Sequence, residues 1–288
     1  MQVISAKILT RFLAILNFKK LVEISLSNPT RAKKLLVSKH LYQTFDVNEF
    51  QILDKSVVTL SPKGEVSNIH ILFFHGGGYV LEGTSMHWKI LEKIATKANC
   101  KVSYIDYPLA PEYTYKTTFE MVQQCYDKLL TENPNDTFML MGDSAGGGLA
   151  LAFAQKLAAE NELVQPTKII LFSPWLDMNV QNSEIERLDK ILSVKALRDA
   201  AKAYSGGEDI NQYLLSPING KLEGLGETMV FYGTHEILYP DCLKLKDKTA
   251  VLENFHFREF VGMQHDWVLF PIAEADEALE IAIEFIVR

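Results

Sequence analysis

Cysteine is scarce in this chain of 288 residues, which holds only Cys100, Cys125 and Cys242. An odd number at wide spacing provides no disulfide framework, and no CxxC pair is present to bind a metal ion. The disulfide-rich class of small secreted domains is thereby excluded. The scarcity favours a reducing compartment, and we expect a cytoplasmic protein.

Long apolar runs are also missing. The apolar run near the N-terminus, "FLAILNF", is preceded by Arg11 and followed by Lys19 and Lys20. It is too short to cross a bilayer and lacks the small-residue cleavage site of a signal peptide. The sequence therefore predicts neither a transmembrane segment nor a secretory leader.

Acidic residues are nearly absent from one end of the chain. Residues 1–40 hold eight Lys or Arg and one Glu, a charge of +7, which leaves −14 for the rest because the net charge is −7. We interpret this segment as helices that pack an apolar side on the acidic body and keep a basic face in water. The alternative is weak contact with an anionic membrane surface, through an apolar stripe of Ile8, Phe12, Leu13 and Ile15. Nucleic-acid binding is not expected, because no aromatic reading surface is interleaved with the basic residues.

A metal signature is missing as well. His235, Glu236, Asp241, His265 and Asp266 offer carboxylates and imidazoles toward the C-terminus, but no HExxH pattern or helical histidine pair occurs. A metal site would also leave the serine motif described below unexplained. We expect no metal and no organic cofactor.

What the chain does contain, from residue 57 onward, is an alternation of strands and helices. The expected strands are apolar runs at 56–60, 69–74, 101–107, 137–142, 168–174, 228–233 and 255–261. The expected helices lie near 86–98, 117–132, 147–160, 239–249 and 273–286. This order predicts a single α/β domain over residues 1–288, with a mostly parallel, doubly wound sheet. Residues 1–50 and about 178–220 do not follow the alternation, and we expect both to form a helical cap over the carboxyl ends of the strands.

A serine motif follows one of these strands directly. Residues 142–146, "GDSAG", fit G-x-S-x-G, with an apolar strand before them and a small-residue helix after them. This is the setting of a nucleophile elbow, in which a strained strand-to-helix turn exposes the serine oxygen. Ser144 would also lie at a helix N-terminus, where unpaired N–H groups favour negative charge. We expect Ser144 to be a nucleophile.

A second glycine-rich stretch, "HGGGY" at residues 75–79, follows the strand at 69–74. Acyl transfer needs hydrogen-bond donors aimed at the oxyanion of the tetrahedral intermediate. The N–H of the residue after the nucleophile supplies one, here Ala145, and a loop of HGGG type supplies the others. We expect Gly77 and Gly78 to donate and Gly76 to serve the turn.

The chain resembles the hormone-sensitive-lipase-like branch of the α/β-hydrolase esterases over roughly residues 55–288. The resemblance rests on five motifs in family order: "HGGGY" (75–79), "DYPLAPE" (106–112), "GDSAGGGLA" (142–150), "SPWLD" (173–177) and "GMQHDW" (262–267). It implies that Ser144 is the nucleophile and His265 the general base, with Gly77, Gly78 and Ala145 around the oxyanion. It also implies structural roles for His75 and Asp143.

Two positions depart from the family pattern. The aspartate that usually orients the histidine is replaced by Glu236 in "GTHEILYPD", residues 233–241. A glutamate can hold the same tautomer and stabilise the imidazolium, and position 236 directly follows a strand. Asp241 is the competing acid, although an acidic residue is also favourable at a helix start. The second departure is Pro108, where the family typically carries arginine.

The resemblance implies a serine carboxylesterase that acts on short-chain acyl esters, with a small ester and water as its partners. A deacetylase or amidase of a small metabolite would use the same groups. A non-catalytic small-molecule receptor on this fold would lack the triad histidine, whereas His265 is present here. We therefore favour the enzyme.

Overall fold

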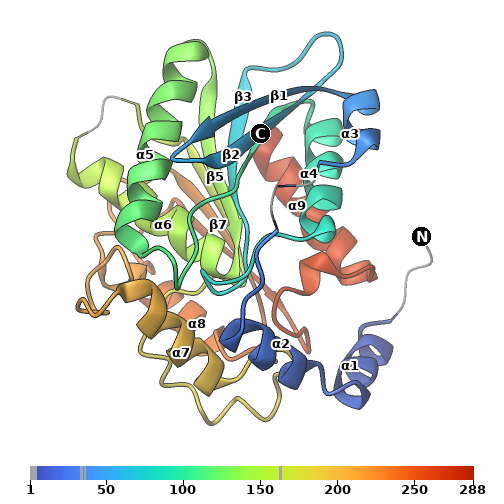
Figure 1. Ribbon diagram of the computed structural model, residues 1–288, viewed down its shortest axis with the longest axis vertical. Coiled ribbons are helices and arrows are strands. Elements are labelled where there is room, and N and C mark those ends of the chain that lie inside the picture. The colour runs from blue at the N-terminus through green and yellow to red at the C-terminus, as the bar shows by residue number, and fades with distance from the viewer. Residues whose placement is uncertain (1–4, 33–34, 36, 162–163) are drawn as a thin grey trace.

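An eight-stranded sheet forms the centre of the computed structural model, which describes residues 5–32, 35, 37–161 and 164–288 (Figure 1). The strand order is β1-β2-β4-β3-β5-β6-β7-β8. Neighbours from β4 to β8 run parallel, while β2 is antiparallel to both β1 and β4. The strands are β1 (Phe45–Ile52), β2 (Lys55–Pro62), β3 (Ile69–Phe74), β4 (Lys101–Ile105), β5 (Thr137–Asp143), β6 (Lys168–Phe172), β7 (Glu227–Gly233) and β8 (Phe255–Phe260). The predicted mostly parallel sheet is confirmed.

Helices cover both faces of this sheet. Figure 1 shows α4 and α9 on one side, where they pack against each other, and α5 and α6 on the other. The apolar strands β3, β5 and β6 are buried on both faces for this reason. The helices that follow the strands are α4 (Ser85–Ala98), α5 (Tyr115–Glu132), α6 (Ser144–Ala159), α8 (Tyr239–Lys248) and α9 (Ala273–Val287). Each matches a helix expected from the sequence.

Strand β1 is a correction to the sequence analysis, which expected only helices in residues 1–50. It pairs with β2 as a hairpin whose turn residues, Leu53 and Asp54, both have positive φ, at 47° and 60°. Two-residue turns of this kind usually carry Asn-Gly or Asp-Gly, and neither is present. The strand is also half-exposed at the sheet edge, so it lacks the apolar run that marks a buried strand.

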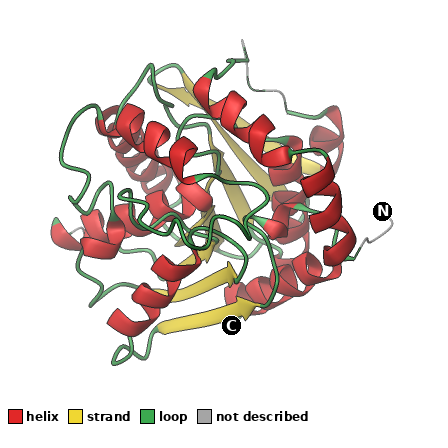
Figure 2. Cartoon of the chain, turned by 90° about the horizontal axis from the view of Figure 1, so that it is seen from below, coloured by secondary structure: helices red, strands yellow, loops and turns green. Residues whose placement is uncertain are grey.

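The helices outside this alternation gather at the carboxyl ends of the strands. They are α1 (Ala6–Ile15), α2 (Phe18–Ser27) and α7 (Val194–Ser205), and α2 packs against α7 (Figure 1). A helix of six residues, α3 (Lys39–Thr44), leads instead into β1. Figure 2 views this end of the molecule, where loops crowd between the helices. Among the described residues, no helix is both long and apolar enough to cross a membrane.

Candidate active site

Ser144 lies on a sharp turn between the last residue of β5 and the first turn of α6. Its φ of 51° belongs to the left-handed region, which is strained for a residue with a Cβ. The turn is tight because Gly146 lies against the backbone of Phe74 at the end of β3, where an added Cβ would overlap the carbonyl oxygen. The close approach joins the serine turn to the loop that follows β3.

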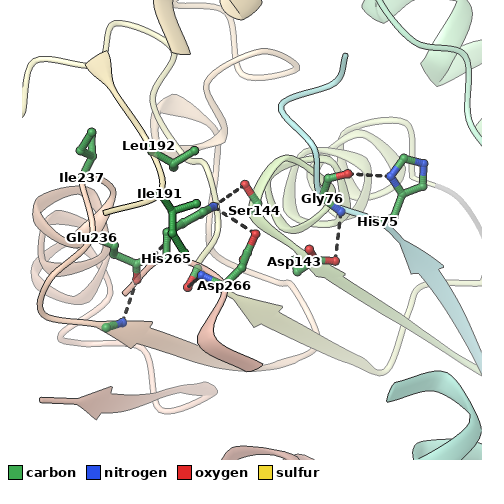
Figure 3. Close-up of polar contacts among 12 residues, drawn as sticks. His75, Gly76, Asp143, Ser144, Ile191, Leu192, Glu236, Ile237, His265 and Asp266 are labelled. Atoms are coloured by element: carbon green, nitrogen blue, oxygen red, sulfur yellow. Dashed lines mark hydrogen bonds and ion pairs between the residues drawn. The ribbon is translucent and has the colours of Figure 1, made fainter. Parts of the chain in front are cut away.

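Two side chains from two other loops form a hydrogen-bonded line with this serine. The Nε2 atom of His265, in the loop after β8, lies 2.8 Å from Ser144 Oγ, and its Nδ1 lies 2.8 Å from Oε2 of Glu236 (Figure 3). Oε1 of Glu236 accepts a hydrogen bond of 2.7 Å from the N–H of Gly233. All three side chains are buried. An Nδ1–H that donates to Glu236 leaves the Nε2 lone pair free to accept a proton from Ser144.

Burial and charge oppose each other at this imidazole. Burial lowers the pKa of His265, but the carboxylates of Asp266 and Glu236 outweigh it and hold that pKa well above its usual range. Burial raises the pKa of Glu236, and its hydrogen bond with His265 opposes the rise. Oδ2 of Asp266 lies 3.1 Å from Nε2, the nitrogen that also faces Ser144. The sequence analysis considered Asp266 only as a possible metal ligand, and it rejected a metal site.

The N–H groups of the three glycines in the HGGG loop after β3 have different surroundings. The N–H of Gly76 donates a 3.0 Å hydrogen bond to Oδ1 of Asp143, so it is not free for a ligand. Gly77 has φ 114°, a conformation that L side chains rarely adopt, and an added Cβ would lie 2.6 Å from the carbonyl oxygen of Leu81. Gly78 follows with φ 65°. The N–H of Ala145 belongs to the first turn of α6, where no intrahelical acceptor exists.

His75 is enclosed and has a packing role. Its ring stacks between Tyr107 and Tyr104, with centroids 4.5 Å and 5.5 Å away, and the Tyr107 hydroxyl donates to the His75 carbonyl oxygen at 2.6 Å. Burial lowers the pKa of His75 to about 4, so its ring is neutral at neutral pH. The ring contacts Gly76 O through Nδ1 at 2.6 Å, and no hydrogen bond joins it to Ser144 among the described residues.

Asp143 joins the serine turn to α4 as well as to the HGGG loop. Its Oδ2 atom lies 3.2 Å from Nε2 of His87, and the Nδ1 atom of His87 accepts a 2.8 Å hydrogen bond from the N–H of Thr84. His87 is buried, and the sequence analysis assigned it no role. Its position three residues after Thr84, at a helix start, was the only available signal.

Asp241, the alternative acid, lies in the first turn of α8 and hydrogen-bonds Asn182. Its Oδ2 atom accepts a 3.1 Å hydrogen bond from the side-chain amide of Asn182. Burial, followed by repulsion from Asp177, raises the pKa of Asp241 to about 7. Of the two acids considered from the sequence, only Glu236 contacts His265 in the described structure.

The segment before α7 is hydrogen-bonded to the loops that carry Glu236 and His265. Oδ1 of buried Asp189 accepts hydrogen bonds from the N–H groups of Ile191 and Leu192, and Oδ2 accepts one from Ile237 at 2.9 Å. The side chain of Gln264, next to His265, accepts a 2.6 Å hydrogen bond from the N–H of Lys190. Sequence reasoning missed both residues: Asp189 belongs to no recognised motif, and within the motif at 262–267 a role was assigned only to His265.

Arg31 hydrogen-bonds the chain two residues after Pro108, the position at which the family typically has arginine. Its guanidinium donates to the carbonyl oxygens of Val80 and Ala110, both at 2.6 Å, and to Oε2 of Glu112 at 2.7 Å. These bonds tie the segment after α2 to the end of the HGGG loop. Within the described part of the chain, no three His, Cys, Asp or Glu side chains are placed to hold a metal ion.

A hydrogen-bonded serine, histidine and carboxylate, contributed in that chain order from the ends of parallel strands, is the arrangement found in serine hydrolases with the α/β-hydrolase fold. The fold and the geometry therefore define this class of protein.

Comparison with known proteins narrows the class. The family described as "alpha/beta hydrolase fold" matches residues 71–269. An esterase of Acinetobacter venetianus is 32% identical over 234 residues, which cover 77% of this chain and 76% of the relative. An acetyl-hydrolase of Streptomyces hygroscopicus is 28% identical, over 75% of this chain and 74% of its own length. A solved esterase of the bacterial hormone-sensitive lipase family superposes with a TM-score of 0.78 at 26% identity, over 93% of this chain and 89% of that one.

The chain belongs to the α/β-hydrolase family, in its hormone-sensitive-lipase-like branch of esterases. It is a carboxylic ester hydrolase, and the receptor alternative is set aside.

Proposed function

We propose that this enzyme hydrolyses short-chain acyl esters through Ser144, His265 and Glu236. The proposal is carried by one observation, the line of two 2.8 Å contacts from Ser144 Oγ through the imidazole to the Glu236 carboxylate. In the first step the serine O–H breaks, its proton passes to Nε2, and Oγ bonds to the acyl carbon. Glu236 stabilises the imidazolium that forms. His265 then protonates the leaving alcohol, and it activates a water molecule to release the acid.

The oxyanion of the tetrahedral intermediate would be bound by the N–H groups of Gly77, Gly78 and Ala145. The bond from Gly76 to Asp143 supports this assignment, because it removes the first of the three glycines from the set of available donors. Asp143 and His75 would then hold the loop in place without exchanging protons. No organic cofactor or metal enters any of these steps.

Packing above the HGGG loop favours small acyl groups. A Cβ at Gly78 would lie 3.1 Å from Leu26 of α2 and 3.8 Å from Ala200 of α7. Both helices belong to the cap that we propose for this single-domain protein, made of the N-terminal helices and the region of residues 178–220. The "acetyl-hydrolase" name of the Streptomyces relative agrees with a short acyl group, and it keeps a deacetylase of a small metabolite, or an amidase, as the alternative.

With p-nitrophenyl esters of two to sixteen carbons, we expect kcat/KM to be highest at the short end and to fall roughly tenfold or more by the longest chain. Long chains would have to displace side chains of the cap. Leu26→Ala should move the preference toward longer esters, because it removes the side chain nearest Gly78. Leu21→Ala, on the exposed side of the same helix, is the matched control. A wild-type preference for long chains would contradict the short-chain proposal.

We also propose weak contact between α1 and an anionic membrane surface. The helix buries Leu9 and Leu13, so Leu13 was wrongly included in the exposed stripe, but Ile8, Phe12 and Ile15 are more than half exposed. Exposed Lys7 and Arg11 lie on the same helix. Exposed apolar side chains with flanking basic residues are typical of helices that lie in a membrane interface. Location in the cytoplasm stays a prediction from cysteine usage.

Sedimentation with vesicles tests this contact. We expect the protein to sediment with phosphatidylglycerol vesicles at low salt and much less with phosphatidylcholine vesicles, because the attraction is partly electrostatic. Replacing Ile8, Phe12 and Ile15 by serine should abolish sedimentation without loss of esterase activity. Replacing exposed Val251 and Val261 by serine should have no effect. Equal sedimentation of all three proteins would refute the contact.

A further inference from the structure

Asp266 places a second carboxylate on the nitrogen of His265 that handles the reaction's proton. Its Oδ2 atom lies 3.1 Å from Nε2, which is also 2.8 Å from Ser144 Oγ, as the two dashed lines in Figure 3 show. A serine–histidine–carboxylate triad needs a carboxylate on Nδ1 only, and Glu236 already occupies that position. The mechanism above therefore assigns no task to Asp266.

The backbone holds Asp266 at this position. Its φ of 50° is left-handed, and its N–H donates to Ser173 Oγ at 3.3 Å. Ser173 also hydrogen-bonds Glu236. The Asp266 side chain is buried, and its second oxygen, Oδ1, has no hydrogen-bond partner among the described residues. A carboxylate kept in such surroundings is costly unless its other oxygen has a strong partner, which here is the imidazole.

The close contact between Asp266 and His265 requires a proton on one of the two groups. With Nδ1–H donating to Glu236, a neutral imidazole would turn its Nε2 lone pair toward an ionised Asp266, and two acceptors would face each other at 3.1 Å. The contact becomes favourable when the imidazole is protonated or when Asp266 carries the proton. When the proton is on Nε2, or on Oδ2 and donated to Nε2, no lone pair is free for the proton of Ser144.

We propose that Asp266 is a positioning residue that competes with Ser144 for the Nε2 proton of His265, so that the resting site holds one proton more than serine activation allows. The inference builds on the esterase mechanism proposed above. Once the extra proton leaves, Ser144 attacks, its O–H proton moves to Nε2, and Asp266 stabilises the imidazolium together with Glu236. The same carboxylate thus delays activation at low pH and strengthens the base at high pH.

The charges around His265 agree with this assignment. Glu236 faces it from the loop after β7, Asp266 from its own loop, and Asp189 lies close enough from the cap segment to interact with it electrostatically. Asp143, at the end of β5, repels Asp266 and is paired with His87. Burial raises the pKa of Asp266 to about 6, and the attraction of His265 opposes the rise. His265 is thus the cation among several buried carboxylates.

The test is the pH dependence of kcat/KM for p-nitrophenyl acetate in Asp266→Asn and Asp266→Gly. Asparagine and glycine both suit the left-handed backbone, and glycine removes every polar atom of the side chain. For the wild type, we expect kcat/KM to fall at low pH with a midpoint above the ordinary range of a histidine pKa; this fall is the acid limb of the profile. In both variants it should move to lower pH by about 1 to 3 units, the effect of losing one close opposite charge. At high pH both should be slower than the wild type, by about tenfold, because the base is weaker.

The two pH profiles should therefore cross, a result that a structural role would not produce. Lower rates at every pH with an unmoved acid limb, in folded variants, would overturn the proposal. Asp241→Asn is the matched control, since it neutralises a buried carboxylate that contacts Asn182 rather than His265, and its limb should stay at the wild-type pH.

An NMR titration of the His265 ring without substrate separates this proposal from the catalytic one. The signal is assigned by its loss in His265→Ala, and its titration midpoint should fall by the same 1 to 3 units in Asp266→Asn. A fall in a protein that hydrolyses no ester would support the shared proton and refute the proposed activity. An unchanged midpoint would refute the role of Asp266 even in an active esterase.

Discussion

Ser144→Ala and His265→Ala are expected to reduce kcat for p-nitrophenyl acetate to nearly the rate of the uncatalysed reaction. In a serine protease with the same three groups, removal of the serine or the histidine costs about 10⁶-fold in kcat. The reason is that the serine and the histidine act in the same step. Without the serine oxygen no acyl-enzyme forms, and without the imidazole the hydroxyl keeps its proton at neutral pH.

At both positions the alanine variant could fail to fold, so a second variant that disturbs the fold less is measured beside it. Ser144 has φ 51°, which strains alanine, so Ser144→Gly should be measured beside Ser144→Ala. His265→Ala leaves Glu236 and Asp266 without their common partner, so His265→Gln provides a less disruptive change. Thermal unfolding midpoints identify the variants that are folded.

A fluorophosphonate probe checks the same prediction without a substrate. It should add to Ser144 of the wild type, as located by mass spectrometry of the labelled peptide, and should fail to label Ser144→Gly. Wild-type turnover in any folded Ser144 or His265 variant, or labelling at another serine, would refute the assignment.

Glu236→Gln is expected to lower kcat by roughly 10³- to 10⁴-fold, as loss of the triad carboxylate charge does in a serine protease. Asp241→Asn is expected to leave kcat within about twofold, in line with ordinary changes away from a site. The two acids were both considered from the sequence, and they lie five residues apart. Only Glu236 contacts the imidazole.

The direction of the Glu236→Gln effect follows from the backbone. The N–H of Gly233 donates to Oε1, so in the variant it selects the carbonyl oxygen of glutamine for that position. The amide nitrogen is then left facing Nδ1 of His265, to which it donates. That bond places the ring proton on Nε2, where it blocks acceptance of the serine proton. A loss in kcat larger than any change in KM is therefore expected.

Steady-state kinetics of the two variants decide between the acids. Unfolding midpoints close to that of the wild type would show that the comparison concerns chemistry and not folding. If Asp241→Asn proved the slower variant, Asp241 would be the acid in solution and the contact of Glu236 with His265 would have another role.

Local patterns allowed much of the fold to be predicted. The limits of β3 at residues 69–74 agree with the apolar run in the sequence, and α5 and α9 begin and end within two residues of their patterns. Strands buried on both faces are continuous apolar runs, so they stand out without tertiary knowledge. Strand β1 did not stand out, because its stability comes from pairing with β2 and its turn residues are atypical.

The sequence by itself determined the fold class and the positions of Ser144, His265 and the HGGG loop, because each is encoded in a few adjacent residues whose backbone must turn in one way. Tertiary structure decided which groups face the reactive atoms. The contacts of Asp266 with the shared nitrogen, of Asp189 with Ile237, and of Gly76 with Asp143 depend on where separate strands end. Hydrogen bonds act over about 3 Å, and only the packed sheet brings residues 67 or 121 positions apart within that distance.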